Sequence, residues 1–115
     1  MPVHLDVTPA GDGAATLVVS GEVDLSTAGQ LRAAGIAAVV APDCPALAVD
    51  LAGVEFLDSS GVGALVAIRA AGLEHGRPVT IVEPSRRARQ VLEICGLDAE
   101  FGLAASPSVP VGEQQ

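Results

Sequence analysis

The sequence predicts one α/β domain: an opening β-hairpin, then alternating strand–helix units that form a mainly parallel sheet with helices chiefly on one face. Three observations predict this fold class. Of the 115 residues 50% are hydrophobic but only 2% are aromatic, so a single aliphatic core is expected. Apolar residues recur with period two in some segments and at helical spacing in others. Only a few residues connect one segment to the next, and the predicted order is β-β-α-β-α-β-α-β.

The chain opens with a predicted β-hairpin. From Val3 to Val7 apolar and polar residues alternate, which indicates a strand with one buried face. From Pro9 to Gly13 the sequence is typical of a turn, and from Ala15 to Ser20 it is apolar again. Two such segments joined by a turn predict neighbouring antiparallel strands.

A first helix and a third strand follow. Thr27 and Gln30 have the spacing of a capping box, and apolar residues then recur at helical intervals, so we expect a helix from Thr27 to Val40. The prolines within residues 42–45 end it, because proline cannot continue a helix. The next strand is predicted from Ala46 to Leu51. Its bulky residues alternate with small or polar ones, so helices are expected to cover one of its faces.

The same alternation continues through the second half of the chain. Residues 54–57 lead into Asp58-Ser59-Ser60-Gly61, where a second amphipathic helix begins, and Gly72 is expected to help end it. A strand is predicted from Val79 to Glu83.

The last predicted elements are a helix and a strand. Ser85 is expected to cap the helix, which runs through Ile94 and stops at Gly96. Phe101 and Leu103 are expected to form a final short strand. We expect the domain to span residues 1–104 and a flexible tail, rich in proline and serine, to span 105–115.

Charge and composition exclude several functions. Six basic and fourteen acidic residues give a net charge of −8, which repels phosphate backbones, so no direct nucleic-acid partner is expected. All six basic residues are arginines, and the lack of lysine excludes both a P-loop lysine and a Schiff-base lysine.

The sequence also favours a cytoplasmic location. It shows no signal-peptide pattern at the amino terminus, and no apolar stretch approaches the ~20 residues that a bilayer requires, so no membrane insertion is expected. Cys44 and Cys95 are isolated in apolar sequence, which predicts two reduced, structural cysteines.

The segment Asp58-Ser59-Ser60-Gly61 lies where a predicted strand gives way to a helix. A helix amino terminus offers unpaired N–H groups and a partial positive charge. One interpretation is that Asp58 or Ser59 only caps the helix. The other is that one hydroxyl is exposed to a kinase at a position that tolerates phosphate, with Gly61 leaving the approach open.

Asp24 follows an apolar strand just as Asp58 does. If those strands are parallel, both carboxylates lie at the same edge of the sheet, which is the usual ligand side. Asp24 could equally act only at the start of the helix that follows.

The remaining candidate residues indicate neither catalysis nor a bound cofactor. His4 and His75 are not placed near a serine as a triad requires, and no metal-ligand spacing or phosphate-binding glycine loop is present. Arg86, Arg87 and Arg89 open the third predicted helix, where cations oppose the helix dipole. A solvated face is the favoured interpretation of these arginines, a compensating role the alternative, and Glu93 is spaced to pair with Arg89.

Three segments in combination identify a known family: Gly21-Glu22-Val23-Asp24-Leu25, then Val49-Asp50-Leu51, then Phe56-Leu57-Asp58-Ser59-Ser60-Gly61-Val62-Gly63-Ala64-Leu65. The chain resembles the STAS domain of bacterial anti-sigma factor antagonists, in order from about Val3 to Leu103. It departs from the family in one respect. Similar domains usually finish with another amphipathic helix, whereas this chain has its Pro/Ser-rich segment after Leu103.

The resemblance implies roles for particular residues. The residue phosphorylated in the family is the second Ser or Thr of Asp-Ser-Ser/Thr-Gly, which corresponds to Ser60 here. The partner-binding residues implied are Asp24, Asp58, Ser59, Ser60, Gly61 and Val62.

The resemblance also implies a partner-switching cycle. The unmodified protein binds an anti-sigma factor that has serine-kinase activity, and a sigma factor is released. Phosphorylation of Ser60 ends the binding, and a metal-dependent serine phosphatase resets the cycle. The kinase supplies ATP and Mg²⁺, so this chain is expected to be no enzyme. Similar STAS domains instead serve as regulatory or accessory subunits of membrane transporter complexes, which is the alternative function.

Overall fold

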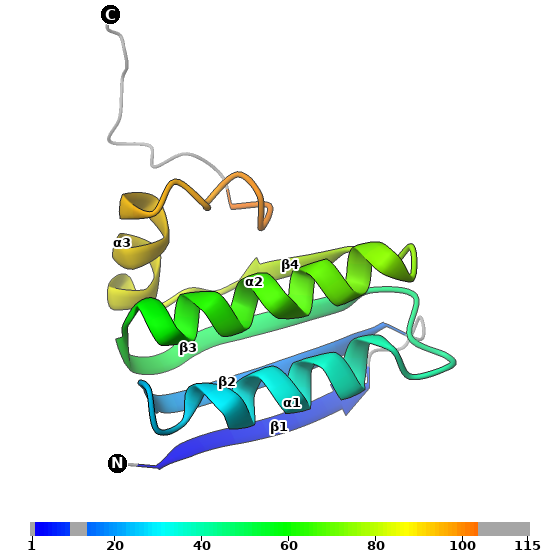
Figure 1. The fold of residues 1–115 in the computed structure, drawn as a ribbon, viewed down its shortest axis with the longest axis horizontal. Coiled ribbons are helices and arrows are strands. Elements are labelled where there is room, and N and C mark those ends of the chain that lie inside the picture. Colours follow the sequence, from blue (N-terminus) through cyan, green and yellow to red (C-terminus); the bar gives the residue numbers. More distant parts are fainter. Residues whose placement is uncertain (1, 10–13, 104–115) are drawn as a thin grey trace, which may run out of the picture.

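The computed structural model describes residues 2–9 and 14–103, which form a four-stranded sheet with helices packed against it (Figure 1). The strands are ordered β1-β2-β3-β4 across the sheet. The elements follow the chain in the order β1 (Val3–Pro9), β2 (Ala15–Val23), α1 (Ala28–Val39), β3 (Leu47–Leu57), α2 (Ser59–Glu74), β4 (Val79–Val82) and α3 (Arg86–Ile94). The predicted fold class is confirmed.

The sheet is antiparallel only at its β1 edge. β1 pairs antiparallel with β2, from Val3 opposite Gly21 to Pro9 opposite Ala15, as the predicted hairpin requires. β2, β3 and β4 are parallel to one another. The turn was predicted at Pro9–Gly13, but Pro9 is the last residue of β1, and residues 10–13 lie outside the described residues.

Helices α1 and α2 lie side by side on one face of the sheet (Figure 1). Alternate residues of β3 point into this layer, so Leu47, Val49 and Leu51 are buried while the intervening residues are more exposed. The two helices approach closely at Gly35, where an added Cβ would lie 2.2 Å from Ile68 Cδ1. Glycine is therefore required at that crossing by packing.

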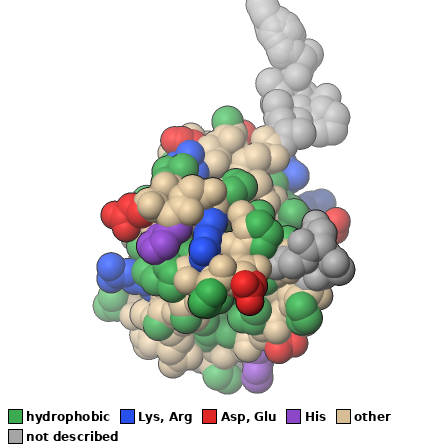
Figure 2. All heavy atoms as spheres, turned by 90° about the vertical axis from the view of Figure 1, so that its right-hand side faces the viewer, with side chains coloured by type: hydrophobic (Ala, Val, Ile, Leu, Met, Phe, Trp, Pro, Cys, Tyr) green, Lys and Arg blue, Asp and Glu red, His purple; other side chains and the backbone are tan. Residues whose placement is uncertain are grey.

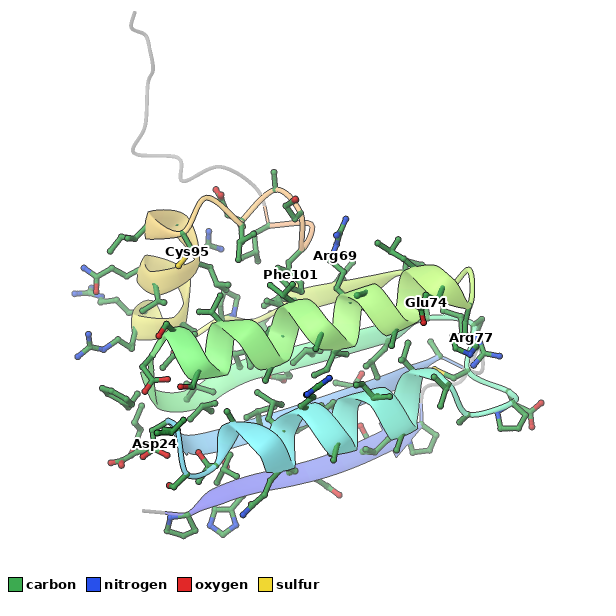
Figure 3. All side chains as sticks on the ribbon, viewed as in Figure 1. Asp24, Arg69, Glu74, Arg77, Cys95 and Phe101 are labelled. Carbon is green, nitrogen blue, oxygen red and sulfur yellow. The ribbon has the colours of Figure 1, made fainter. Side chains whose placement is uncertain are left out.

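The predicted final strand at Phe101 and Leu103 is wrong. Phe101 lies in a turn, and its carbonyl accepts a single backbone hydrogen bond from Ile81 N of β4 at 2.9 Å. Its ring is fully buried in the core, next to the outer edge of β4 (Figure 3). The buried ring, local turn hydrogen bonds and one backbone hydrogen bond to β4 fix this segment without a strand ladder.

The predicted end of α2 is also corrected. Gly72 lies within the helix and is buried, and an added Cβ there would meet Arg77 O at 2.5 Å. The helix ends at Glu74, and Gly76 provides the left-handed conformation beyond it with φ of +68°. Gly96 ends α3 in the same way, as predicted, with φ of +72°.

Other predictions of local structure have mixed outcomes. Both cysteines are free as predicted, but only Cys44 is buried, so a structural role in the core is wrong for the exposed Cys95. The expected tail 105–115 lies outside the described residues.

In the described part of the chain no helix is long and apolar enough to cross a membrane. The end of the molecule shown in Figure 2 mixes basic, acidic and hydrophobic side chains.

Candidate functional site

The parallel pairing of β2 with β3 brings two carboxylate residues to one edge of the sheet. Val23 and Leu57 are register partners at the ends of these strands, so Asp24 and Asp58 follow at the same edge. Asp58 N donates a hydrogen bond to Val23 O at 3.3 Å, which joins the two strand ends. The predicted juxtaposition of Asp24 and Asp58 is confirmed.

Asp58 caps helix α2. Its backbone is extended, and its Oδ1 accepts hydrogen bonds from Ser60 N at 2.9 Å and from Gly61 N at 3.2 Å. Of the two predicted candidates, Asp58 and not Ser59 therefore performs the capping. This cap fixes the first turn of α2 and with it the direction in which Ser60 projects.

Asp24 holds the turn between β2 and α1. Its Oδ1 accepts hydrogen bonds from the hydroxyl of Ser26 at 2.7 Å, from Ser26 N at 3.0 Å and from Thr27 N at 3.2 Å. The predicted capping box of Thr27 and Gln30 is wrong, because the Thr27 side chain makes no cap hydrogen bond. Thr27 is buried and its hydroxyl donates instead to Glu22 O at 2.8 Å.

These hydrogen bonds also set the protonation of Asp24. The hydrogen bond from the Ser26 hydroxyl is the largest cause that lowers the pKa of Asp24, and desolvation opposes it. The Ser26 N–H, the Thr27 hydroxyl and the Thr27 N–H lower the pKa further. A lowered pKa in the folded state means that the contribution of this carboxylate to stability is present above its ordinary pKa. That contribution is lost as the pH falls through the lowered value.

Ser60 faces a groove between the amino-terminal halves of α1 and α2, with a volume of about 300 Å³. Ser59 is exposed and does not line this groove, whereas Ser60 is half-buried. Within the described residues, the Ser60 hydroxyl makes no hydrogen bond. The groove is lined by Leu25, Ala28, Gly29, Arg32, Ser60, Gly63, Ala64 and Ala67.

Gly61 and Val62 lie beneath this surface. Gly61 is buried, and an added Cβ would lie 2.5 Å from Leu57 Cδ1 and 2.7 Å from Val23 Cγ1. Glycine at this position is therefore explained by packing between the two strand ends. Val62 is only 7% exposed, so both residues support the site from below.

Two exposed apolar side chains beside the site were not predicted from the sequence. Leu25 is 83% exposed at the rim of the groove. Phe56 is 38% exposed, and the Arg87 guanidinium lies 6.0 Å from the centre of its ring. An apolar residue directly after a strand-end aspartate is a signal that could have identified Leu25. Nothing in the local sequence could have identified the contact of Phe56 with Arg87, because α3 lies 30 residues further along the chain.

The arginines at the start of α3 have defined surroundings. Arg86 and Arg87 are exposed, and Arg89 forms the predicted surface pair with Glu93 at 3.7 Å. Ser85 caps the helix as expected, accepting a hydrogen bond from Ala88 N at 3.1 Å.

Among residues 2–9 and 14–103, no three His, Cys, Asp or Glu side chains come together in a way that could hold a metal ion.

Comparison with known proteins assigns the family. A family model described as "Mlab, STAS domain" matches residues 7–105. The chain belongs to the STAS domain family. The STAS domain is 38% identical over 105 residues to the anti-sigma-F factor antagonist RsfB of Mycobacterium tuberculosis (strain CDC 1551 / Oshkosh), a match that covers 89% of this chain and 83% of that protein.

Solved structures agree with this assignment. The STAS domain is 37% identical to an anti-sigma factor antagonist from Mycobacterium paratuberculosis, with a TM-score of 0.71 over 92% of this chain and 88% of that chain. It shares the fold of the unphosphorylated anti-sigma factor antagonist SpoIIAA, with a TM-score of 0.73 at 19% identity over 96% and 95% of the two chains. The resemblance inferred from the sequence is confirmed.

Proposed function

We propose that this STAS domain is an anti-sigma factor antagonist that binds an anti-sigma factor with serine-kinase activity while Ser60 is unmodified. Binding releases a sigma factor. The kinase transfers the γ-phosphoryl group of ATP to Ser60 Oγ, the hydroxyl loses its proton and ADP leaves, which ends the binding. A metal-dependent serine phosphatase hydrolyses the phosphoserine and resets the cycle.

The observation that carries the proposal is the 38% identity to a protein named as an anti-sigma-F factor antagonist, over most of both chains. The position of Ser60 supports it further. The residue lies in the first turn of α2, where a phosphate is tolerated, and it lines a groove that reaches the surface.

Charge and burial explain why one phosphate would be enough to end binding. A phosphoserine adds about −1.5 to −2 charges at neutral pH. It would place them beside Asp58 and next to the exposed Leu25, which is suited to an apolar contact with the partner. A loss of about 3 kcal/mol weakens binding more than a hundredfold, so no refolding of this domain is needed.

The test is phosphorylation and binding by the cognate anti-sigma kinase. With kinase and ATP, intact mass should increase by one phosphoryl group, and Ser60→Ala should abolish the increase while Ser59→Ala, the matched control, retains it. Ser60→Ala should bind the kinase and not be released, whereas Ser60→Asp should bind more weakly. A kinase that binds tightly without modifying Ser60, or an unchanged Kd for Ser60→Asp, would contradict the proposal.

The alternative function, a STAS regulatory or accessory subunit of a membrane transporter complex, predicts a different partner. Affinity purification of the tagged chain from its native cells separates the two by the partner recovered. Recovery of a serine kinase that modifies Ser60 supports partner switching. Recovery of a transporter ATPase or a membrane-spanning transporter supports the alternative.

A further inference from the structure

We propose that Arg32 of α1 binds the phosphate on Ser60, so that the groove between α1 and α2 is a built-in site for the phosphorylated side chain. The inference rests on the proposed phosphorylation of Ser60 and identifies the residue that receives its product. The ligand is a phosphate monoester dianion held within the same chain.

The groove itself brings the two residues together. Ser60 lines it from the first turn of α2 and Arg32 lines it from α1, one helical turn after Ala28. Arg32 is the only charged side chain in the groove lining, which otherwise consists of Leu25 and small residues. A phosphate that enters this groove therefore meets one cation and no carboxylate among the lining side chains.

Both side chains are available for this contact. In the described part of the chain, neither the Ser60 hydroxyl nor the Arg32 guanidinium has a hydrogen-bond partner, and Arg32 forms no ion pair. Arg32 is exposed, so it can change rotamer without disturbing the core. Arg77 differs in this respect, because it already donates hydrogen bonds to carbonyl groups at the end of α1 and in the loop that follows.

The start of α2 offers the phosphate few free donors. A phosphate at a helix amino terminus is ordinarily bound by the free N–H groups of the first turn. Here Ser60 N and Gly61 N donate to Asp58 Oδ1, and Val62 N donates to Asp58 O. Most donors of the first turn are therefore occupied, and the Asp58 carboxylate nearby repels the phosphate. The five N–H groups of a guanidinium match the phosphate oxygens, so Arg32 would supply the donors that this turn lacks.

Pairing with Arg32 would also direct the phosphate into the groove. A phosphate held there covers the small residues of the groove floor, such as Gly29, Gly63 and Ala64. Arg32 would thus contribute to partner release, because it would hold the new negative charge at one place in the groove.

The test measures the phosphate directly in the full chain. Phosphoserine is introduced at position 60 during translation, and the ³¹P chemical shift is followed against pH. With Arg32 present, the second pKa of the phosphate should lie about half a unit or more below its value in the Arg32→Met variant, since a nearby cation favours the dianion. Arg32→Lys should restore part of the shift, because it retains the charge but not the bidentate geometry.

Arg69→Met is the matched control. Arg69 lies nine residues after Ser60 on α2, which places it on the opposite side of the helix and about 13 Å along its axis. It projects from the side of α2 opposite α1 and donates to Glu100 O (Figure 3). Its substitution should leave the phosphate pKa unchanged.

The result that overturns the inference is a phosphate pKa that Arg32→Met leaves unchanged while the ¹H–¹⁵N spectrum shows an intact fold. An equal shift with Arg69→Met would also overturn it, because the effect would then be one of net charge. Since the phosphate is installed without the kinase, these outcomes do not depend on the proposed function. A kinase that fails to modify Ser60 would contradict the proposed function and leave this measurement intact.

Discussion

At the scale of single residues, the two site carboxylates act first on the backbone. Asp58 Oδ1 binds two N–H groups at the start of α2, and Asp24 Oδ1 binds the turn before α1. One oxygen of each carboxylate therefore accepts hydrogen bonds from neighbouring groups of the same chain. The position of Ser60 depends on this arrangement, since its own N–H is one of the donors that Asp58 accepts.

Asp58→Ala should lower the free energy of unfolding by about 1 kcal/mol, the usual cost of losing an N-cap, as measured by urea denaturation. Asp58→Asn should stay close to the wild type, because asparagine caps as well as aspartate. Ser59→Ala, an exposed neighbour that caps nothing, should change stability by less than about 0.5 kcal/mol. An equal decrease in the free energy of unfolding for Ser59→Ala and Asp58→Ala would show that the Asp58 cap makes no contribution of its own.

At the scale of secondary structure elements, α1 depends on a residue from outside its own sequence. The last turn of α1 contains no basic residue. Arg77, in the connection between α2 and β4, donates from Nη1 to Val39 O at 2.7 Å and to Ala41 O at 2.6 Å (Figure 3). These bonds satisfy carbonyl groups at the end of the helix and place a cation at the negative end of its dipole.

Arg77→Met should therefore destabilise the domain by about 1–3 kcal/mol, because charged hydrogen bonds to carbonyl groups are lost. Arg86→Met, at an exposed arginine of α3, is the control and should remain within about 0.5 kcal/mol of the wild type. Thermal or urea unfolding of both variants measures the difference. A similar small change for the two variants would mean that water satisfies the end of α1 equally well.

The elements also show which parts of the fold the sequence could predict. Most strands and helices with a clear period were predicted within a few residues, but β3 continues to Leu57, six residues beyond its predicted end at Leu51. The parallel order followed from the alternation of strands and helices, so the juxtaposition of Asp24 and Asp58 was predictable. Interactions between distant segments were not. The single bond between Ile81 and Phe101, and the bond between Thr27 and Glu22 O that replaced the predicted cap, leave no periodic signal.

At the scale of the whole molecule, the site lies at one end of an acidic domain. Asp24 and Glu74 lie at opposite ends of the helical layer (Figure 3). Glu74 lies sixteen positions after Asp58 along the helix, which corresponds to about 24 Å. This exceeds the ~8 Å over which exposed charges interact at physiological ionic strength. The net charge of −8 therefore acts on a partner mainly through the charges at the site end.

The proposed docking should consequently depend on salt and on the position of each charge. Association of the unmodified chain with the anti-sigma kinase should slow several-fold as salt rises from about 50 to about 500 mM, with little change in the dissociation rate, because steering acts before contact. Asp58→Asn and Glu74→Gln each remove one negative charge. Only Asp58→Asn should slow association, since Glu74 lies beyond the screening distance. Stopped-flow or surface-binding kinetics measure both rates. An association rate that ignores salt, or that responds equally to both substitutions, would show that the acidic composition does not guide docking.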